Sequence, residues 1–177
     1  MQYELTVALR GIMPPIWRTL DVPGNLTLHN LHEVLQVAMG WENAHLYLFQ
    51  VGRQVYGESG REWAMPVADA TTMTLAEIAA KTSAFTYEYD MGDSWVHEIT
   101  VGQTREGNGE DRPRCTGGAR ACPPEDCGGP PGYEGFLAAI TDPRHEEHDA
   151  LLEWVGGQFD PEAFDLTAVE RVFSRLR

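Results

Sequence analysis

Apolar and polar residues alternate in two parts of the chain, and this alternation predicts two β-hairpins. Near the N-terminus, the segments 3–9 and 16–22 alternate as half-buried strands do, and a turn containing Gly and Pro joins them. The segments 85–89 and 95–101 show the same period of two residues, with turn residues at 91–94 between them. Each pair is therefore expected to form an antiparallel hairpin.

Helical periodicity appears between the two predicted hairpins. The apolar residues of segment 28–40 fall on one helical face, and Thr27 is placed to cap the N-terminus. Thr74 and Glu77 have the spacing of a capping box and predict a short second helix, while segment 45–51 is predicted as a strand. The pattern predicts an α+β fold, in which a mainly antiparallel sheet of two hairpins carries a helix across one face, resembling a β-grasp arrangement.

The character of the chain changes after the second hairpin. Residues 102–131 are rich in Gly and Pro, which suit neither helix nor strand because proline lacks a backbone donor and glycine loses much entropy on folding. Three helical patterns follow. We expect one domain with a sheet core over 1–104, a loop over 105–132, and a helical C-terminal subdomain over 133–177 that packs on the core.

Charge and hydropathy limit the classes of partner. The net charge is −14, from 27 acidic and 13 basic residues, and it opposes approach to a phosphate backbone, so general nucleic-acid binding is not expected. The acidic excess lies mostly in residues 121–170, which form either a solvated face or a docking surface for a basic protein partner. No segment has the roughly 18 consecutive apolar residues of a membrane helix, and the chain opens on a strand pattern, so we expect a cytoplasmic protein without a membrane partner.

All three cysteines lie in the Gly/Pro-rich segment, at Cys115, Cys122 and Cys127, and His145 and His148 follow it. An odd number of clustered cysteines suits reduced thiols better than a disulfide framework. Thiolate and imidazole groups are the usual ligands of structural zinc, and one ion would hold a loop of this length in place. Any four of these five cysteine and histidine residues would complete a tetrahedral zinc site. The alternative is a loop held by proline geometry, hydrogen bonds and small buried thiols.

Two further groups offer chemistry. Asp93, Ser94 and His97 lie close along the second hairpin and include an acid, a nucleophile and a base, although strand alternation also allows His97 a packing role. An aromatic and histidine-rich set surrounds the first helix and third strand, and it forms either an aromatic core or a groove for a ligand or peptide. Its members are Trp17, His32, Trp41, His45, Tyr47 and Tyr56. The candidate ligand-binding residues are Trp41, His45, Asp93 and His97.

Several motifs, spread nearly from end to end, resemble the plasmid pRiA4b ORF-3-like family. They are PPIWR at 14–18, LH at 31–32, MGW at 39–41, HL at 45–46, YEYD at 87–90, GDSWVH at 92–97, CPPED at 122–126, GG at 128–129 and GY at 132–133. The resemblance implies an α+β domain that is encoded on plasmids or chromosomes or carried by insertion sequences, and that is sometimes labelled resolvase-like. It implies no catalytic residues. Family members can carry Val where Cys127 stands, which favours Cys115, Cys122, His145 and His148 as the zinc ligands and leaves Cys127 as a substitute.

The sequence contains no recombinase arrangement of clustered arginines, no Walker loop, no dinucleotide fingerprint and no H-E-x-x-H motif. We therefore expect a non-enzymatic binding module, associated with mobile elements, that acts through protein contacts and contains structural zinc. The alternative is a metal-dependent hydrolase or nuclease that uses the Cys/His cluster or the hairpin with Asp93 and His97. An ion with four protein ligands favours the first hypothesis, and an open coordination position beside a cleft favours the second.

Overall fold

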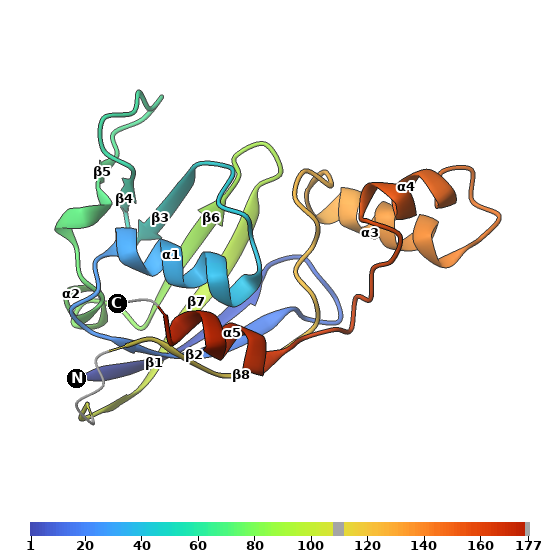
Figure 1. The fold of residues 1–177 in the computed structure, drawn as a ribbon. Helices are drawn as coiled ribbons and strands as arrows, with labels where there is room; N and C mark the ends of the chain where they lie inside the picture. Colours follow the sequence, from blue (N-terminus) through green and yellow to red (C-terminus); the bar gives the residue numbers. More distant parts are fainter. Residues whose placement is uncertain (108–111, 176–177) are drawn as a thin grey trace.

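A single eight-stranded sheet organises the computed structural model, which describes residues 1–107 and 112–175 (Figure 1). The strands lie in the order β5-β4-β3-β6-β7-β1-β2-β8, and every neighbouring pair is antiparallel except the short edge pair of β4 and β5. The strands are β1 Gln2–Leu9, β2 Trp17–Pro23, β3 Tyr47–Val51, β4 Gln54–Gly57, β5 Ala68–Asp69, β6 Ala84–Tyr89, β7 Trp95–Arg105 and β8 Arg114–Ala119. The fold is thus α+β with a mostly antiparallel sheet.

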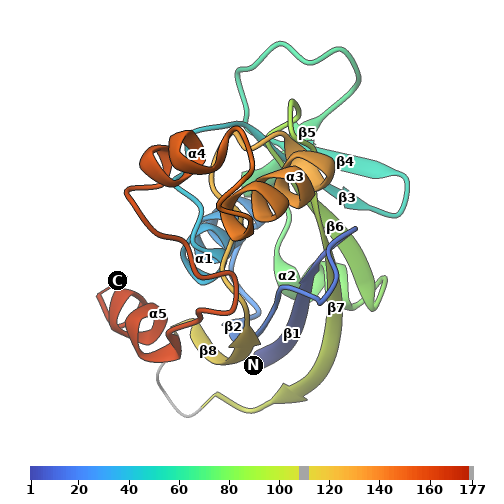
Figure 2. The ribbon, with the colours of Figure 1, turned by 90° about the vertical axis from the view of Figure 1, so that its right-hand side faces the viewer.

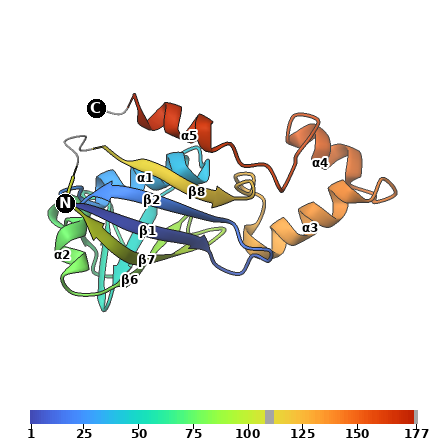
Figure 3. The same ribbon diagram turned by 90° about the horizontal axis from the view of Figure 1, so that it is seen from below.

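Five α-helices and one short 3₁₀ turn accompany the sheet. They are α1 Leu28–Met39, η1 Ala70–Thr72, α2 Leu75–Ala79, α3 Gly129–Thr141, α4 His148–Trp154 and α5 Leu166–Phe173. Helix α1 crosses one face of the sheet, and α5 packs beside β8 and α1 (Figure 2). Helices α3 and α4 pack on each other and project beyond one end of the sheet (Figures 1 and 3). None of the helices in the described part of the chain is both long and apolar enough to span a bilayer.

The helix predicted over 28–40 is confirmed. The Thr27 side chain accepts a hydrogen bond from the backbone N–H of Asn30, and Gly40 ends the helix with φ of 105°, a left-handed conformation that glycine adopts without strain. Leu31 and Leu35 are completely buried in the core, as the apolar periodicity requires. The capping box of α2 is also present as predicted.

Both predicted hairpins are confirmed, and pairing of β1 with β7 joins them in the middle of the sheet. The comparison with a β-grasp fold is not confirmed, because β3, β4, β5 and β8 extend this sheet on both sides of the hairpins. The C-terminal third contains three helices separated by irregular segments, so it is helical only in part. Residues 108–111 of the predicted loop and 176–177 of the predicted subdomain lie outside the described residues.

The structure corrects the prediction that the whole Gly/Pro-rich segment is a loop, because β8 lies within it and pairs with β2. The residues of β8 show no alternation of apolar side chains, so only the partner strand reveals them as a strand. Gly118 is required there by close packing: a Cβ on this residue would lie 2.7 Å from the Phe164 ring and 2.8 Å from the Arg18 side chain.

Arg18 in β2 connects the sheet to its covering elements. Its guanidinium is 1% exposed and donates hydrogen bonds to carbonyl oxygens at the end of α1 and at the end of β8, over 2.7 to 3.3 Å. The acceptors are the backbone oxygens of Trp17, Ala38, Met39, Ala119 and Arg120. The ring of Phe164 covers the guanidinium at 4.0 Å. The buried charge is therefore satisfied by carbonyl dipoles and an aromatic face.

Replacing Arg18 with Met should lower the free energy of unfolding by roughly 3–5 kcal/mol, because several buried carbonyl groups lose their donor at once. Chemical denaturation followed by circular dichroism measures this loss. Arg10→Met is the matched control, since its ion pair with Glu98 is exposed and should contribute less than about 1 kcal/mol. Equal effects of the two substitutions would contradict the role given to Arg18.

Candidate metal centre

Four side chains converge where three connecting segments meet at one end of the sheet. His45 precedes β3, Asp90 directly follows β6, and Glu125 and Asp126 lie between β8 and α3. The Nε2 atom of His45 is 2.9 Å from Asp126 Oδ1, 3.6 Å from Asp90 Oδ2 and 3.8 Å from Glu125 Oε2. One nitrogen therefore faces three carboxylate groups. We call these four residues the His45 cluster.

The backbone conformation orients two of the carboxylates. Asp90 and Asp126 both have φ of 57°, a left-handed conformation that aspartate tolerates better than most residues. The Oδ1 atom of Asp90 accepts a hydrogen bond from the backbone N–H of Gly92 at 2.9 Å, which leaves Oδ2 facing His45. Backbone strain of this kind is typical of functional sites, where the surrounding structure imposes it.

Tyr89 connects two segments of the cluster. Its hydroxyl accepts hydrogen bonds from the backbone N–H groups of Ala44 at 2.8 Å and His45 at 3.3 Å, and it donates to Glu125 Oε1 at 3.0 Å. The backbone N–H of Glu42 donates to the same Oε1 atom at 2.8 Å. Burial raises the pKa of Tyr89, so the phenol stays protonated and keeps donating. These bonds hold Oε1 of Glu125 and leave Oε2 for the cluster.

Two buried atoms of the cluster make no hydrogen bond: Nε2 of His45 and Oε2 of Glu125. Leaving a buried polar atom unsatisfied costs about 1–3 kcal/mol, and gathering three carboxylates costs more through their mutual repulsion. A cation among them would remove both costs. The side chains of Asp90 and Glu125 are only 10% and 13% exposed, whereas Asp126 is 70% exposed, so the cluster is open on the side of Asp126.

The three cysteines predicted as zinc ligands occupy apolar surroundings. Cys115 is buried in β8, where its Sγ contacts the Gly117 carbonyl oxygen at 3.4 Å and burial raises the pKa of its thiol. Burial also raises the pKa of Cys122, and burial together with the charge of Asp93 raises the pKa of Cys127 to about 12. Burial therefore favours the protonated form of each thiol in the metal-free protein.

The two histidines predicted as zinc ligands lie beyond α3. His148 uses Nδ1 to donate to the Ala139 carbonyl oxygen at 2.9 Å, and Nδ1 of His145 accepts from the Glu147 N–H at 3.2 Å. Among the described residues, the only group of three or more possible ligands within 4.8 Å of one another is His45, Asp90 and Asp126.

The predicted quartet of Cys115, Cys122, His145 and His148, with Cys127 as a substitute, is therefore not assembled in this structure. Strand pairing holds Cys115 inside the sheet, while the helix α3 carries the histidines away from it.

The candidates of the second hairpin have separate roles. His97 is completely buried, accepts from Trp41 Nε1 at 3.1 Å and donates to the Tyr87 carbonyl oxygen at 3.2 Å. Burial lowers the pKa of His97 to about 4, so it is a neutral part of the aromatic core. Asp93 instead accepts from the Gly128 N–H at 2.9 Å and ties its turn to the segment with Asp126. Among the described residues, no hydrogen bond links Asp93, Ser94 and His97 to one another, and Ser94 donates to Glu88 instead.

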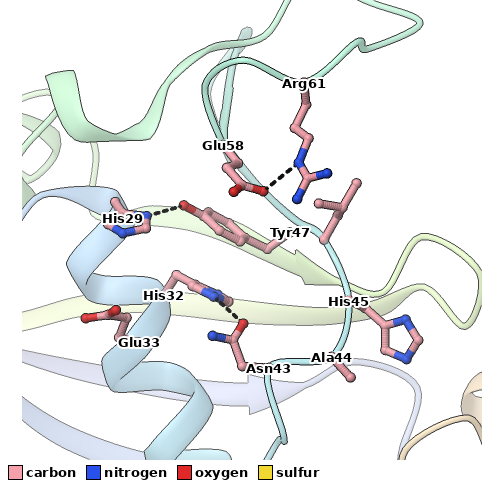
Figure 4. A pocket seen from close by; sticks show the side chains of 10 residues that line it. His29, His32, Glu33, Asn43, Ala44, His45, Tyr47, Glu58 and Arg61 are labelled. Carbon is pink, nitrogen blue, oxygen red and sulfur yellow. Dashed lines mark hydrogen bonds and ion pairs between the residues drawn. The ribbon is translucent and has the colours of Figure 1, made fainter.

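A cavity of about 520 Å³ adjoins the cluster on the side of α1. At the cavity wall, the hydroxyl of Tyr47 lies 3.0 Å from Nδ1 of His29, and Nε of Arg61 forms an ion pair of 3.0 Å with Oε2 of Glu58 (Figure 4). Figure 4 shows the ring of His45 pointing away from Tyr47 and Glu58. His45 therefore contributes its backbone segment to this cavity and its imidazole to the cluster on the other side.

The sequence pointed to His45 but not to its three acidic partners. Asp90 ends the YEYD motif, and Glu125 and Asp126 end the CPPED motif, so all three stood in the segments that carried the family resemblance. Acidic residues that follow aromatic residues or prolines in these motifs were the signal that could have identified them. The signal was incomplete because the two motifs become neighbours only when β6 and the segment after β8 meet in space.

Comparisons with known proteins agree with the motifs. The plasmid pRiA4b ORF-3-like protein family matches residues 1–168. The uncharacterised protein y4hQ of Sinorhizobium fredii is 38% identical over 176 residues, which cover 98% of this chain and 91% of y4hQ. The crystal structure of MM3350 from Methanosarcina mazei Go1, a protein of unknown function, is similar with a TM-score of 0.84 and 35% identity, over 93% of this chain and 95% of that one. The chain belongs to the plasmid pRiA4b ORF-3-like protein family.

Proposed function

We propose that this protein binds a divalent metal ion at the His45 cluster, with His45, Asp90 and Asp126 as ligands and Glu125 beside them, and that the ion activates water for a hydrolytic reaction. The observation that carries the proposal is the buried His45 Nε2, which has no hydrogen bond and faces three carboxylate oxygens within 3.8 Å. The imidazole and the three carboxylates of the cluster together offer one nitrogen and at least three oxygen donors. Their formal charge of about −3 makes a divalent ion a better occupant than a monovalent one.

The donor set indicates which ions fit. Carboxylates alone suit Mg²⁺, Ca²⁺ and Mn²⁺, whereas imidazole suits zinc and other transition metals. A site with both donor types therefore favours Mn²⁺ or Zn²⁺ over Ca²⁺. Zinc thus remains the proposed cofactor together with Mn²⁺, but at the His45 cluster and not at the cysteines.

The exposure of the ligands supports a hydrolytic role. A structural zinc site is usually closed by four protein ligands, while a catalytic site keeps a position for water. Asp126 is 70% exposed, so one side of the cluster is open to solvent and to a substrate. A divalent ion bound there would lower the pKa of a bound water and supply hydroxide near neutral pH.

A non-enzymatic binding module, associated with mobile elements and acting through a protein partner, is the second candidate. The observation that favours it is that all four residues of the His45 cluster lie in connecting segments between strands and helices. An ion there would fix the segment with Glu125 to the turn that follows β6, which is a structural task. Measuring water exchange at the bound ion separates the candidates, because an open site has at least one exchangeable water and a closed structural site has none.

Titration of the metal-free protein with Mn²⁺, followed by electron paramagnetic resonance, should show one bound ion per chain. A saturating ion at about 100 times its Kd adds roughly 2.7 kcal/mol to the free energy of unfolding, and this should raise Tm by about 5–10 °C for a chain of this size. His45→Ala should lower the affinity about 100-fold or more, since it removes the one nitrogen ligand. Absence of stoichiometric binding by both Mn²⁺ and Zn²⁺ would contradict the proposal.

Asp126→Asn should have effects of opposite sign in the metal-free and metal-bound protein. Without metal, the substitution removes one of three repelling charges and should raise Tm; with saturating Mn²⁺, it removes a ligand and should lower Tm. Differential scanning calorimetry measures both. Glu42→Gln is the matched control, because it removes a nearby exposed carboxylate that lies outside the cluster. A change of the same sign in both states would argue against metal coordination by Asp126.

Tyr89→Phe should weaken Mn²⁺ binding by roughly tenfold while the sheet stays folded, because groups that orient metal ligands typically contribute this much. The substitution removes the donor to Glu125 Oε1 and the acceptor for two backbone N–H groups, but it keeps the buried ring. The affinity from the same titration and the far-ultraviolet circular dichroism spectrum check the two parts. Unchanged affinity would show that Glu125 needs no such support.

A further inference from the structure

Two hollows meet beside the His45 cluster, on the side away from the cavity of Figure 4. One, of about 520 Å³, lies between Asp126 and the helices α3 and α4; the other, of about 470 Å³, lies between α4 and the segment with Glu125. Asp126 and Trp154 line both hollows. The two hollows therefore share part of their wall and form one groove, which passes Asp126 on the open side of the cluster. We call it the Trp154 groove.

The wall formed by α3 and α4 is apolar. Trp154 is 47% exposed and packs edge-on against Phe136 at 5.9 Å, and Phe136 in turn meets Phe159 at 5.2 Å. Trp154 is also the most exposed of the five tryptophans, since the other four are buried or half-buried. An aromatic ring that packs on a second ring, which itself packs on a third, and that is still open to solvent can pack against an apolar side chain of a ligand.

The rim of the groove is acidic. The residues that line it include Glu42, Glu125, Asp126 and Glu147, and they include no lysine or arginine. Residues 129–160, which carry α3 and α4, contain seven acidic residues and one arginine. A divalent ion at the cluster would neutralise only part of this charge. The rim therefore repels anions and attracts cationic groups, and the net charge of −14 adds to this attraction at long range.

We propose that the Trp154 groove binds a basic peptide as the substrate of the metal centre. An aromatic or large aliphatic side chain of the peptide packs on Trp154, and Lys or Arg residues on either side face Glu42 and Glu147. This inference rests on the proposed hydrolytic function and adds its substrate class. The reaction is amide hydrolysis: oxygen from water bonds to the carbonyl carbon, the C–N bond breaks, and the amine leaves with one proton from that water. The second proton passes to the amine or to solvent as the carboxylate forms.

Charge complementarity favours a peptide over the other ligands that aromatic grooves bind. A nucleic acid would bring phosphates to a rim without a cation from the protein, which costs energy at every contact. A neutral saccharide could stack on Trp154 but would gain nothing from the acidic rim. A basic peptide uses both features of the groove.

The test uses three acetylated pentapeptide amides and the full chain loaded with Mn²⁺, studied by isothermal titration calorimetry. The probes are Arg-Gly-Phe-Gly-Arg, its analogue with Glu in place of Arg, and its analogue with Ser in place of Phe. We expect the first to bind about tenfold or more tightly than each of the others, since each analogue lacks one of the two complementary features. Its affinity should also fall as the salt concentration rises.

Variants connect this binding to the groove. Trp154→Ala and Glu147→Gln should each lower the affinity for the first peptide by about threefold to tenfold. The controls are Met65→Ala and Glu62→Gln, which change an exposed apolar residue and an exposed carboxylate far from the groove along the chain and should leave the affinity unchanged. Liquid chromatography with mass spectrometry would show cleavage as two products whose combined mass exceeds that of the peptide by one water.

The results separate this inference from the metal proposal. Trp154→Ala should leave Mn²⁺ affinity unchanged, because Trp154 is not among the ligands. Stoichiometric Mn²⁺ binding together with no preference for the basic peptide, or with no effect of Trp154→Ala, would overturn the peptide assignment alone. Binding of cellohexaose or maltohexaose that depends on Trp154, without binding of the peptide, would assign the groove to a saccharide instead.

Discussion

The structure depends most on one buried guanidinium. Arg18 sits in the middle of the packing and bonds to the last turn of α1 and to the end of β8, two elements that are more than seventy residues apart in the sequence. An arginine has five N–H donors in a planar fork, so it can satisfy carbonyl groups from several segments at once. A lysine or an apolar residue could not do so. The buried charge thus fixes the relative position of a helix and a strand.

That constraint also determines where the His45 cluster forms. The chain leaves α1 at Gly40 and reaches His45 five residues later, and it leaves β8 at Ala119 and reaches Glu125 six residues later. Arg18 fixes the end of α1 and the end of β8, so both segments that carry residues of the cluster start from fixed positions. Tyr89 then joins the segments directly through its hydroxyl. A loss of packing around Arg18 is therefore expected to disturb the cluster without any change to its ligands.

Histidines in this protein differ in role because their surroundings differ. His32 and His97 are buried among aromatic rings, and burial lowers the pKa of each to about 4, so they act as neutral members of the core. His45 lies at the same end of the sheet but faces three carboxylates. Aromatic neighbours thus give a packing residue, and acidic neighbours give a candidate metal ligand. Residue type alone does not distinguish the two, which is why the sequence suggested both His45 and His97 as candidates.

The sequence by itself determined the local elements: the two hairpins, the helix α1 with its caps and the capping box of α2 follow from periodicity and from hydrogen bonds between near neighbours. Tertiary structure alone decided the order of the strands, the presence of β8 and the composition of the site. Zinc at Cys115, Cys122, His145 and His148 was inferred from nearness along the chain, but among the described residues no three of these four come within 4.8 Å of one another. His45, Asp90 and Glu125 are at least 35 residues apart and meet only because β3 pairs with β6 and Arg18 anchors the end of β8. Contacts at such separations depend on the packing of the whole sheet, which no local pattern contains.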